Sequence, residues 1–106
     1  MKKIFLGALA TLSLSSVSLA ADYVCESDKV EVRAAAMENS ALYQLEVVEK
    51  GSQETIYQDV AEALLGSGVD ATFNVPGQAI LVIDAAGYGE LTFQDSSYYG
   101  LDCRID

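Results

Sequence analysis

Residues 69–83 read VDATFNVPGQAILVI, and this stretch decides the fold class. Its first half alternates apolar and polar side chains, which is the pattern of a strand with one buried face. The apolar set comprises Val69, Ala71, Phe73 and Val75. Pro76-Gly77 then interrupts the pattern as a turn. Ala79–Ile83 is continuously apolar, which predicts a second strand that is buried on both faces.

The same period of two continues on both sides of this pair. Clear alternation marks Lys29–Ala36, Leu42–Glu49, Glu90–Gln94 and Tyr99–Ile105. In the last of these segments, the side chains expected to point inward are Tyr99, Leu101, Cys103 and Ile105. Shorter strands are expected at Asp22–Ser27 and Glu54–Asp59. Residues 60–65 fit either a helical turn ended by Gly66 or a continuation of the strand, and we prefer the strand.

About eight short strands separated by short turns predict an all-β domain over residues 21–106. The connections are too short for parallel crossovers, so the strands should form an antiparallel meander. A closed or nearly closed small barrel would leave no open sheet edge. A two-sheet sandwich is the alternative.

Residues 1–20 have the features of a secretory signal peptide. Lys2 and Lys3 precede an apolar run, and the small residues Ser18 and Ala20 suit cleavage after Ala20. The apolar run is shorter than the roughly 20 residues that a membrane-spanning helix needs. Cys25 lies too far beyond Ala20 to be a lipoprotein cysteine. We therefore expect a soluble periplasmic or secreted protein of residues 21–106, with no stable membrane insertion.

Cys25 and Cys103 are the only two cysteines of the chain. An oxidising compartment favours a disulfide between them, which would bring the first and last strands together. Two free thiols are the alternative, although no Cys-x-x-Cys spacing supports a redox role.

The charge balance excludes several classes of function. The chain has 6 basic and 16 acidic residues, no His, and a formal net charge of −10, and loss of Lys2 and Lys3 would make it more negative still. Without His, neither a usual zinc site nor a Ser-His or Cys-His nucleophile pair can form, so no metal or other cofactor is expected. An acidic chain also repels the phosphate backbone of nucleic acids.

The carboxylates leave one remote enzymatic alternative. A hydrolase that works through carboxylates alone needs one of them in an apolar pocket. Asp84 follows the apolar run Ala79–Ile83 and is the one candidate, but a strand-end Asp that accepts turn amides is the simpler interpretation. The acidic residues also match no calcium-binding loop.

Tyrosines near turns and the negative charge both favour a protein partner. Tyr88 lies in a turn flanked by glycines, and one of Tyr98 and Tyr99 must face outward. Exposed tyrosines are typical of protein-binding surfaces, although packing at the barrel rim is an ordinary alternative. An acidic surface attracts cationic proteins and accelerates their association.

The chain resembles the bacterial inhibitors of C-type lysozyme, which are small exported eight-stranded barrels. The resemblance rests on Tyr23-Val24-Cys25, on Cys103 and on the number of strands. Ser67-Gly68 matches the family's Ser-Gly loop, and Gly87 matches the glycine of its second motif. Ala71 and Ala86 stand where the family has Tyr and Lys. The resemblance implies a protein that occludes the lysozyme cleft with its loops.

These features predict a non-enzymatic exported binding protein that inhibits or sequesters a cationic protein such as lysozyme. The residues expected to contact the partner are Ser67, Gly68, Gly87, Tyr88 and Tyr98. The alternative from a different class is a structural or accessory protein of the cell envelope.

Overall fold

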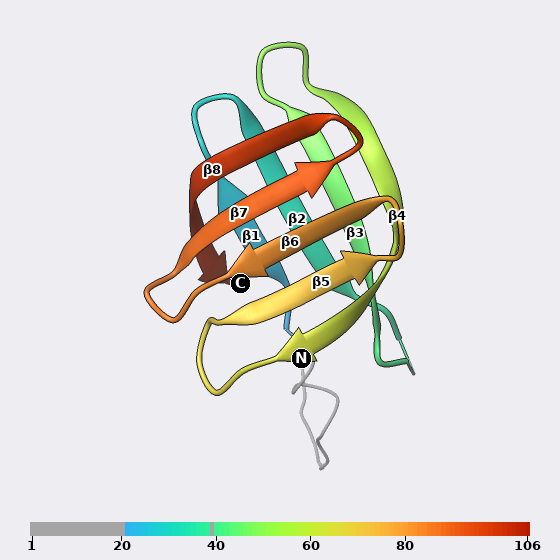
Figure 1. The fold of residues 1–106 in the computed structure, drawn as a ribbon, viewed down its shortest axis with the longest axis vertical. Helices are drawn as coiled ribbons and strands as arrows, with labels where there is room; N and C mark the ends of the chain where they lie inside the picture. The colour runs from blue at the N-terminus through green and yellow to red at the C-terminus, as the bar shows by residue number, and fades with distance from the viewer. Residues whose placement is uncertain (1–20, 39) are drawn as a thin grey trace, which may run out of the picture.

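The computed structural model describes residues 21–38 and 40–106, so the predicted signal peptide lies outside the described residues. The described chain contains eight antiparallel strands and no helix that would be long and apolar enough to cross a membrane. The strands are β1 (Tyr23–Glu26), β2 (Val30–Ala36), β3 (Leu42–Glu49), β4 (Glu54–Leu65), β5 (Ala71–Val75), β6 (Ala79–Ile83), β7 (Tyr88–Phe93) and β8 (Ser96–Ile105). Figure 1 shows them as a meander that curls into a barrel.

The barrel is closed, because β8 pairs with β1 as well as with β7. In that pairing Cys25 lies opposite Cys103, and the two form a disulfide. The predicted barrel and disulfide are therefore confirmed, and the sandwich alternative is wrong. Residues 60–65 belong to β4, where Leu64 pairs with Thr72 of β5, so the strand interpretation is also confirmed.

Inward side chains of all eight strands form a single hydrophobic core. Phe73 is its largest fully buried side chain, and it makes edge-on contacts with Tyr23 and Tyr43 at centroid distances of 5.1 and 5.0 Å. Such edge-to-face pairs contribute about 1 kcal/mol beyond the burial of area. The alternation in residues 69–75 thus predicted the buried set of β5 correctly.

Three expectations about burial are wrong, and one of them concerns Ile105, the last residue of β8, which is 46% exposed. Ile80 and Val82 of β6 are 36% and 41% exposed, because no described element covers the outside of the barrel there. Tyr99 is 68% exposed rather than inward. The register between β7 and β8 shifts between Gly89 and Leu91, which leaves Tyr99 and Gly100 opposite the single residue Glu90. This bulge, in which Gly100 has a φ of 67°, reverses the alternation of β8.

The disulfide packs directly against the backbone of β7 at Gly89. A Cβ atom at this position would lie 2.6 Å from Sγ of Cys103 and 3.3 Å from Sγ of Cys25. Gly89→Ala should therefore lower the free energy of unfolding by about 2 kcal/mol, as overpacking of a core does. Urea denaturation of the oxidised protein measures this loss.

The same substitution in a Cys25→Ala/Cys103→Ala background should cost less than about 1 kcal/mol, since the two sulfur atoms are then absent. Gly51→Ala is the matched control, because a Cβ at Gly51 meets nothing within 4 Å. An equal cost of Gly89→Ala in both backgrounds would show that the disulfide is not what excludes a side chain.

Candidate functional site

The loop between β4 and β5 is held in shape by Asp70. The Gly66 N–H donates to the Asp70 carbonyl at 2.8 Å, and the Gly68 N–H donates to the Asp70 carboxylate at 2.9 Å. Any side chain at Gly66 would collide with that carboxylate, which explains the glycine. Ser67 and Gly68 are exposed at the tip of this fixed loop.

The turn between β6 and β7 is held in the same way by Asp84. Its carboxylate accepts the N–H groups of Ala86 and Tyr88, each at 2.9 Å. Its backbone completes the turn, because the Asp84 N–H donates to Tyr88 and the Asp84 carbonyl accepts from Gly87. Gly87 has a φ of 92°, which favours glycine. Asp84 is exposed, so it is the strand-end Asp of the simpler interpretation and not a carboxylate in an apolar pocket.

These two loops lie side by side at one end of the barrel, at the lower left in Figure 1. A Cβ at Gly87 would stand 3.9 Å from a methyl group of Val69, which follows the Ser67-Gly68 tip. The structure therefore brings together four of the five residues expected to contact a partner. We call Ser67, Gly68, Gly87 and Tyr88 the loop rim. Tyr88 is its large exposed side chain, at 55%.

Tyr98 does not belong to the loop rim. It pairs with Leu91, three residues along β7 from Tyr88, and it points inward. Its ring stacks on Phe93 at a centroid distance of 6.0 Å, and Phe93 in turn contacts Tyr57 of β4. The exposed member of the tyrosine pair is Tyr99, since the β8 bulge turns it outward.

Three carboxylates, those of Asp70, Asp84 and Asp102, lie along the loop rim. The sequence did not predict them as part of a partner-binding site. Tyr88 pairs with Asp102 of β8 on one side and is hydrogen-bonded to Asp84 on the other. Ala71 of β5 pairs with Ile83 of β6, and Asp70 and Asp84 lie one position beyond this pair, toward the loops. The row therefore runs Asp70, Asp84, Tyr88, Asp102. The cross-strand register reveals it, because the three carboxylates are 14 and 18 positions apart in the sequence.

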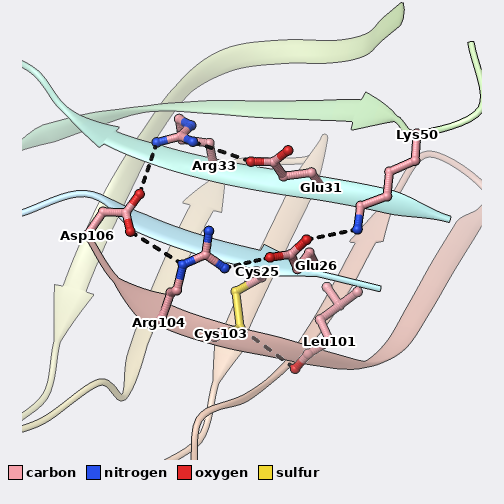
Figure 2. A network of polar contacts seen from close by, with 9 residues as sticks. All are labelled: Cys25, Glu26, Glu31, Arg33, Lys50, Leu101, Cys103, Arg104 and Asp106. Carbon is pink, nitrogen blue, oxygen red and sulfur yellow. Dashed lines mark hydrogen bonds and ion pairs between the residues drawn. A yellow bond between two sulfur atoms is a disulfide. The ribbon is translucent and has the colours of Figure 1, made fainter. Parts of the chain in front are cut away.

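Three of the four basic side chains outside residues 1–20 gather on the outer side of β1, β2 and β8 (Figure 2), where Glu26 lies opposite Asp102. Glu26 accepts from Lys50 at 2.8 Å and from Arg104 at 2.6 Å. Asp106 bridges Arg104 at 3.4 Å and Arg33 at 3.6 Å, and Arg33 also meets Glu31 at 3.3 Å. We call these six residues the ion-pair network. It holds three positive and three negative side chains and is therefore neutral.

The ion-pair network also covers an apolar side chain. Val24 points outward between its cross-strand neighbours Arg33 and Arg104, yet it is completely buried. Arginine stems cover apolar surface while their charged heads stay in water, so these two side chains account for the burial. The network thus shields the outer side of β1 from solvent at Val24.

The chain from the β3–β4 turn to Cys103 is purely acidic. Residues 51–103, which run from the β3–β4 turn to Cys103, contain eight Asp and Glu residues and no Lys or Arg. The net negative charge is therefore concentrated on β4–β7 and the first part of β8, which lie beside the loop rim. Long runs of one sign on one surface attract partners of the opposite sign.

The ion-pair network should make the stability of the folded protein depend on pH. Hydrogen bonds from Lys50 and then from Arg104 hold the pKa of Glu26 below its ordinary value. A carboxylate with a lowered pKa stabilises the folded state above its unfolded pKa and loses this contribution as the pH falls through the folded value. Glu26→Gln should therefore destabilise the protein at neutral pH, and the difference from wild type should vanish in acid.

Urea denaturation of both proteins at a series of pH values down from neutrality measures this difference. Glu54→Gln is the matched control, because Glu54 forms no ion pair within residues 21–38 and 40–106. A difference between Glu26→Gln and wild type that stays constant with pH would contradict the assignment.

Within the described part of the chain, no three His, Cys, Asp or Glu side chains are grouped so that they could hold a metal ion. The arrangement consists instead of two rigid loops, one exposed tyrosine and a one-sided negative charge. No family model matches the sequence, and no curated protein and no solved structure matches it either.

Proposed function

We propose that this chain is an exported, non-enzymatic binding protein that captures a cationic protein and covers part of its surface with the loop rim. The separation of charge on the barrel carries this function. Eight carboxylates and no basic residue lie between positions 51 and 103, whereas three of the four basic residues outside the predicted signal peptide are neutralised in the ion-pair network.

The loop rim suits such contacts for two reasons. Asp70 and Asp84 fix its loops in advance, so that little conformational entropy is lost when a partner binds. Tyr88 supplies a large exposed side chain of a type that often dominates binding energy. The carboxylates beside it would pair with Lys or Arg of the partner and accelerate the encounter.

A C-type lysozyme is the most concrete partner, because it is cationic and because the chain resembles its inhibitors. Ala86 stands in place of the lysine that those inhibitors insert. Inhibition by this protein would therefore depend on Ser67, Gly68 and Tyr88, with the acidic residues Asp84 and Asp102 beside them.

The test is to mix the oxidised protein with a C-type lysozyme at low ionic strength. We expect a complex in size-exclusion chromatography, reduced lysis of cell walls, and weaker binding as salt is added. Tyr88→Ala should weaken binding at least about tenfold. Ile56→Ala is the control, since Ile56 is exposed but lies far along β4 from the loop rim. Absence of a complex together with undiminished lysis would contradict lysozyme as the partner.

A further inference from the structure

The outward side chains of β4–β8 form two rows across the strands. The first row runs Leu64, Thr72, Val82, Glu90, with Tyr99 of the bulge opposite Glu90. The second row runs Glu62, Asn74, Ile80, Thr92, Ser97. We call these two rows the outer face. It adjoins the loop rim, because Tyr88 lies two residues before Glu90 on β7.

The outer face exposes several large apolar side chains. Leu64 is 76% exposed and Tyr99 68%, and Val82 and Ile80 lie between them. Together with Tyr88 they make up five of the ten large exposed hydrophobic side chains of the described residues. Contiguous exposed apolar side chains with a polar rim mark interaction surfaces.

The outer face is also hollowed. One depression lies over β4, β5 and β6 and is lined by residues that include Glu62, Leu64 and Thr72. A second lies over the β5–β6 turn and reaches Thr92 of β7. The two share the lining residues Asn74 and Ile80, so they lie next to each other along the second row.

The negative charges of the outer face favour a cationic partner over a second copy of the chain. Glu62 lies at one end of the second row, Glu90 lies between Val82 and Tyr99, and Asp84 and Asp102 adjoin from the loop rim. No basic side chain lies on β4–β7 or their connecting loops. A second copy of the chain would place its own carboxylates opposite these ones, and repulsion between like charges weakens an interface.

We infer that the outer face is a docking surface for a cationic protein that presents apolar side chains among its Lys and Arg residues. This inference rests on the proposed function in one respect, which is that the partner is cationic. It adds that apolar contact with Leu64, Ile80 and Val82 contributes to affinity, so that positive charge alone does not account for binding.

Two probe peptides separate the apolar contribution from the electrostatic one. The first is a short peptide in which Lys and Leu alternate, and the second is an oligolysine of the same charge. The oxidised protein should bind the alternating peptide more tightly than oligolysine by at least about tenfold, which corresponds to about 1.4 kcal/mol. Leu64→Thr/Val82→Thr should remove this preference, while Thr keeps the strands well formed.

Matched variants control for general effects. Ile56→Thr/Ile105→Thr removes exposed apolar side chains away from the outer face and should keep the preference. Glu62→Gln/Glu90→Gln should weaken binding of both peptides, and Asp28→Asn/Glu38→Gln, in turns outside β4–β8, should weaken it less. Unfolding curves of each variant confirm that the barrel is intact.

Two results would overturn the inference. Equal affinity for the two peptides would show that the outer face makes no apolar contact, and a cationic partner bound through the loop rim would remain possible. A dimer of the wild-type protein that Leu64→Thr/Val82→Thr dissociates would make a second copy the occupant. Loss of lysozyme binding in Tyr88→Ala alone tests the proposed function separately.

Discussion

Replacing Cys25 and Cys103 together with Ala is expected to lower the free energy of unfolding by about 4 kcal/mol. The bond joins residues 78 positions apart, and a cross-link over so long a loop removes much of the entropy of the unfolded chain. Since a small domain has a total stability of only about 5–15 kcal/mol, the variant should be close to unfolding at physiological temperature. Replacing both residues avoids leaving a reactive thiol.

Urea denaturation at neutral pH measures this loss as a shift of the midpoint. Reducing the wild-type protein should shift its midpoint in the same direction by a similar amount, which serves as an independent control. A midpoint unchanged by both treatments would mean that the pairing of β1 with β8 does not depend on the bond.

Phe73→Ala is expected to lower the free energy of unfolding by about 4 kcal/mol, which is typical of emptying an aromatic site in a core. Phe73 is completely buried, and its ring contacts both Tyr23 and Tyr43, so the substitution leaves a cavity where strands β1, β3 and β5 meet. Equilibrium unfolding of the oxidised variant measures the loss.

Phe73→Leu is the matched variant, because it keeps most of the volume and removes the aromatic contacts. It should cost no more than about 1.5 kcal/mol. If Phe73→Ala cost as little as Phe73→Leu, the core would have collapsed around the site, and the packing described for β1, β3 and β5 would not limit stability.

The sequence predicted the fold well because each buried position depends on local alternation. Val69–Val75 alternates, and Phe73 is buried as that pattern requires. The prediction that both faces of β6 are buried was wrong, because a run of apolar residues does not show whether another layer covers the strand. Ile80 and Val82 have no such cover within the described residues and lie exposed on the outer face.

The candidate site was predicted only in part because it depends on which residues lie opposite one another across strands. The glycines and Ser67 stand in recognisable turns, so the two loops could be found. Tyr98 and Tyr99 exchanged roles through a bulge that depends on the pairing of β7 with β8. The row that joins Asp70, Asp84 and Asp102 is a property of the register and has no local signal.

The closure of β8 against β1 brings the two ends of the described chain together. The Asp106 N–H donates to the carbonyl of Asp22 at 2.8 Å. In the order of the barrel β1 and β8 lie three or four positions from β4 and β5, on the side occupied by the ion-pair network. A tether attached at either end would therefore leave the barrel beside the ion-pair network and at the end that carries the loop rim, with the outer side of β4 and β5 turned away from the anchor.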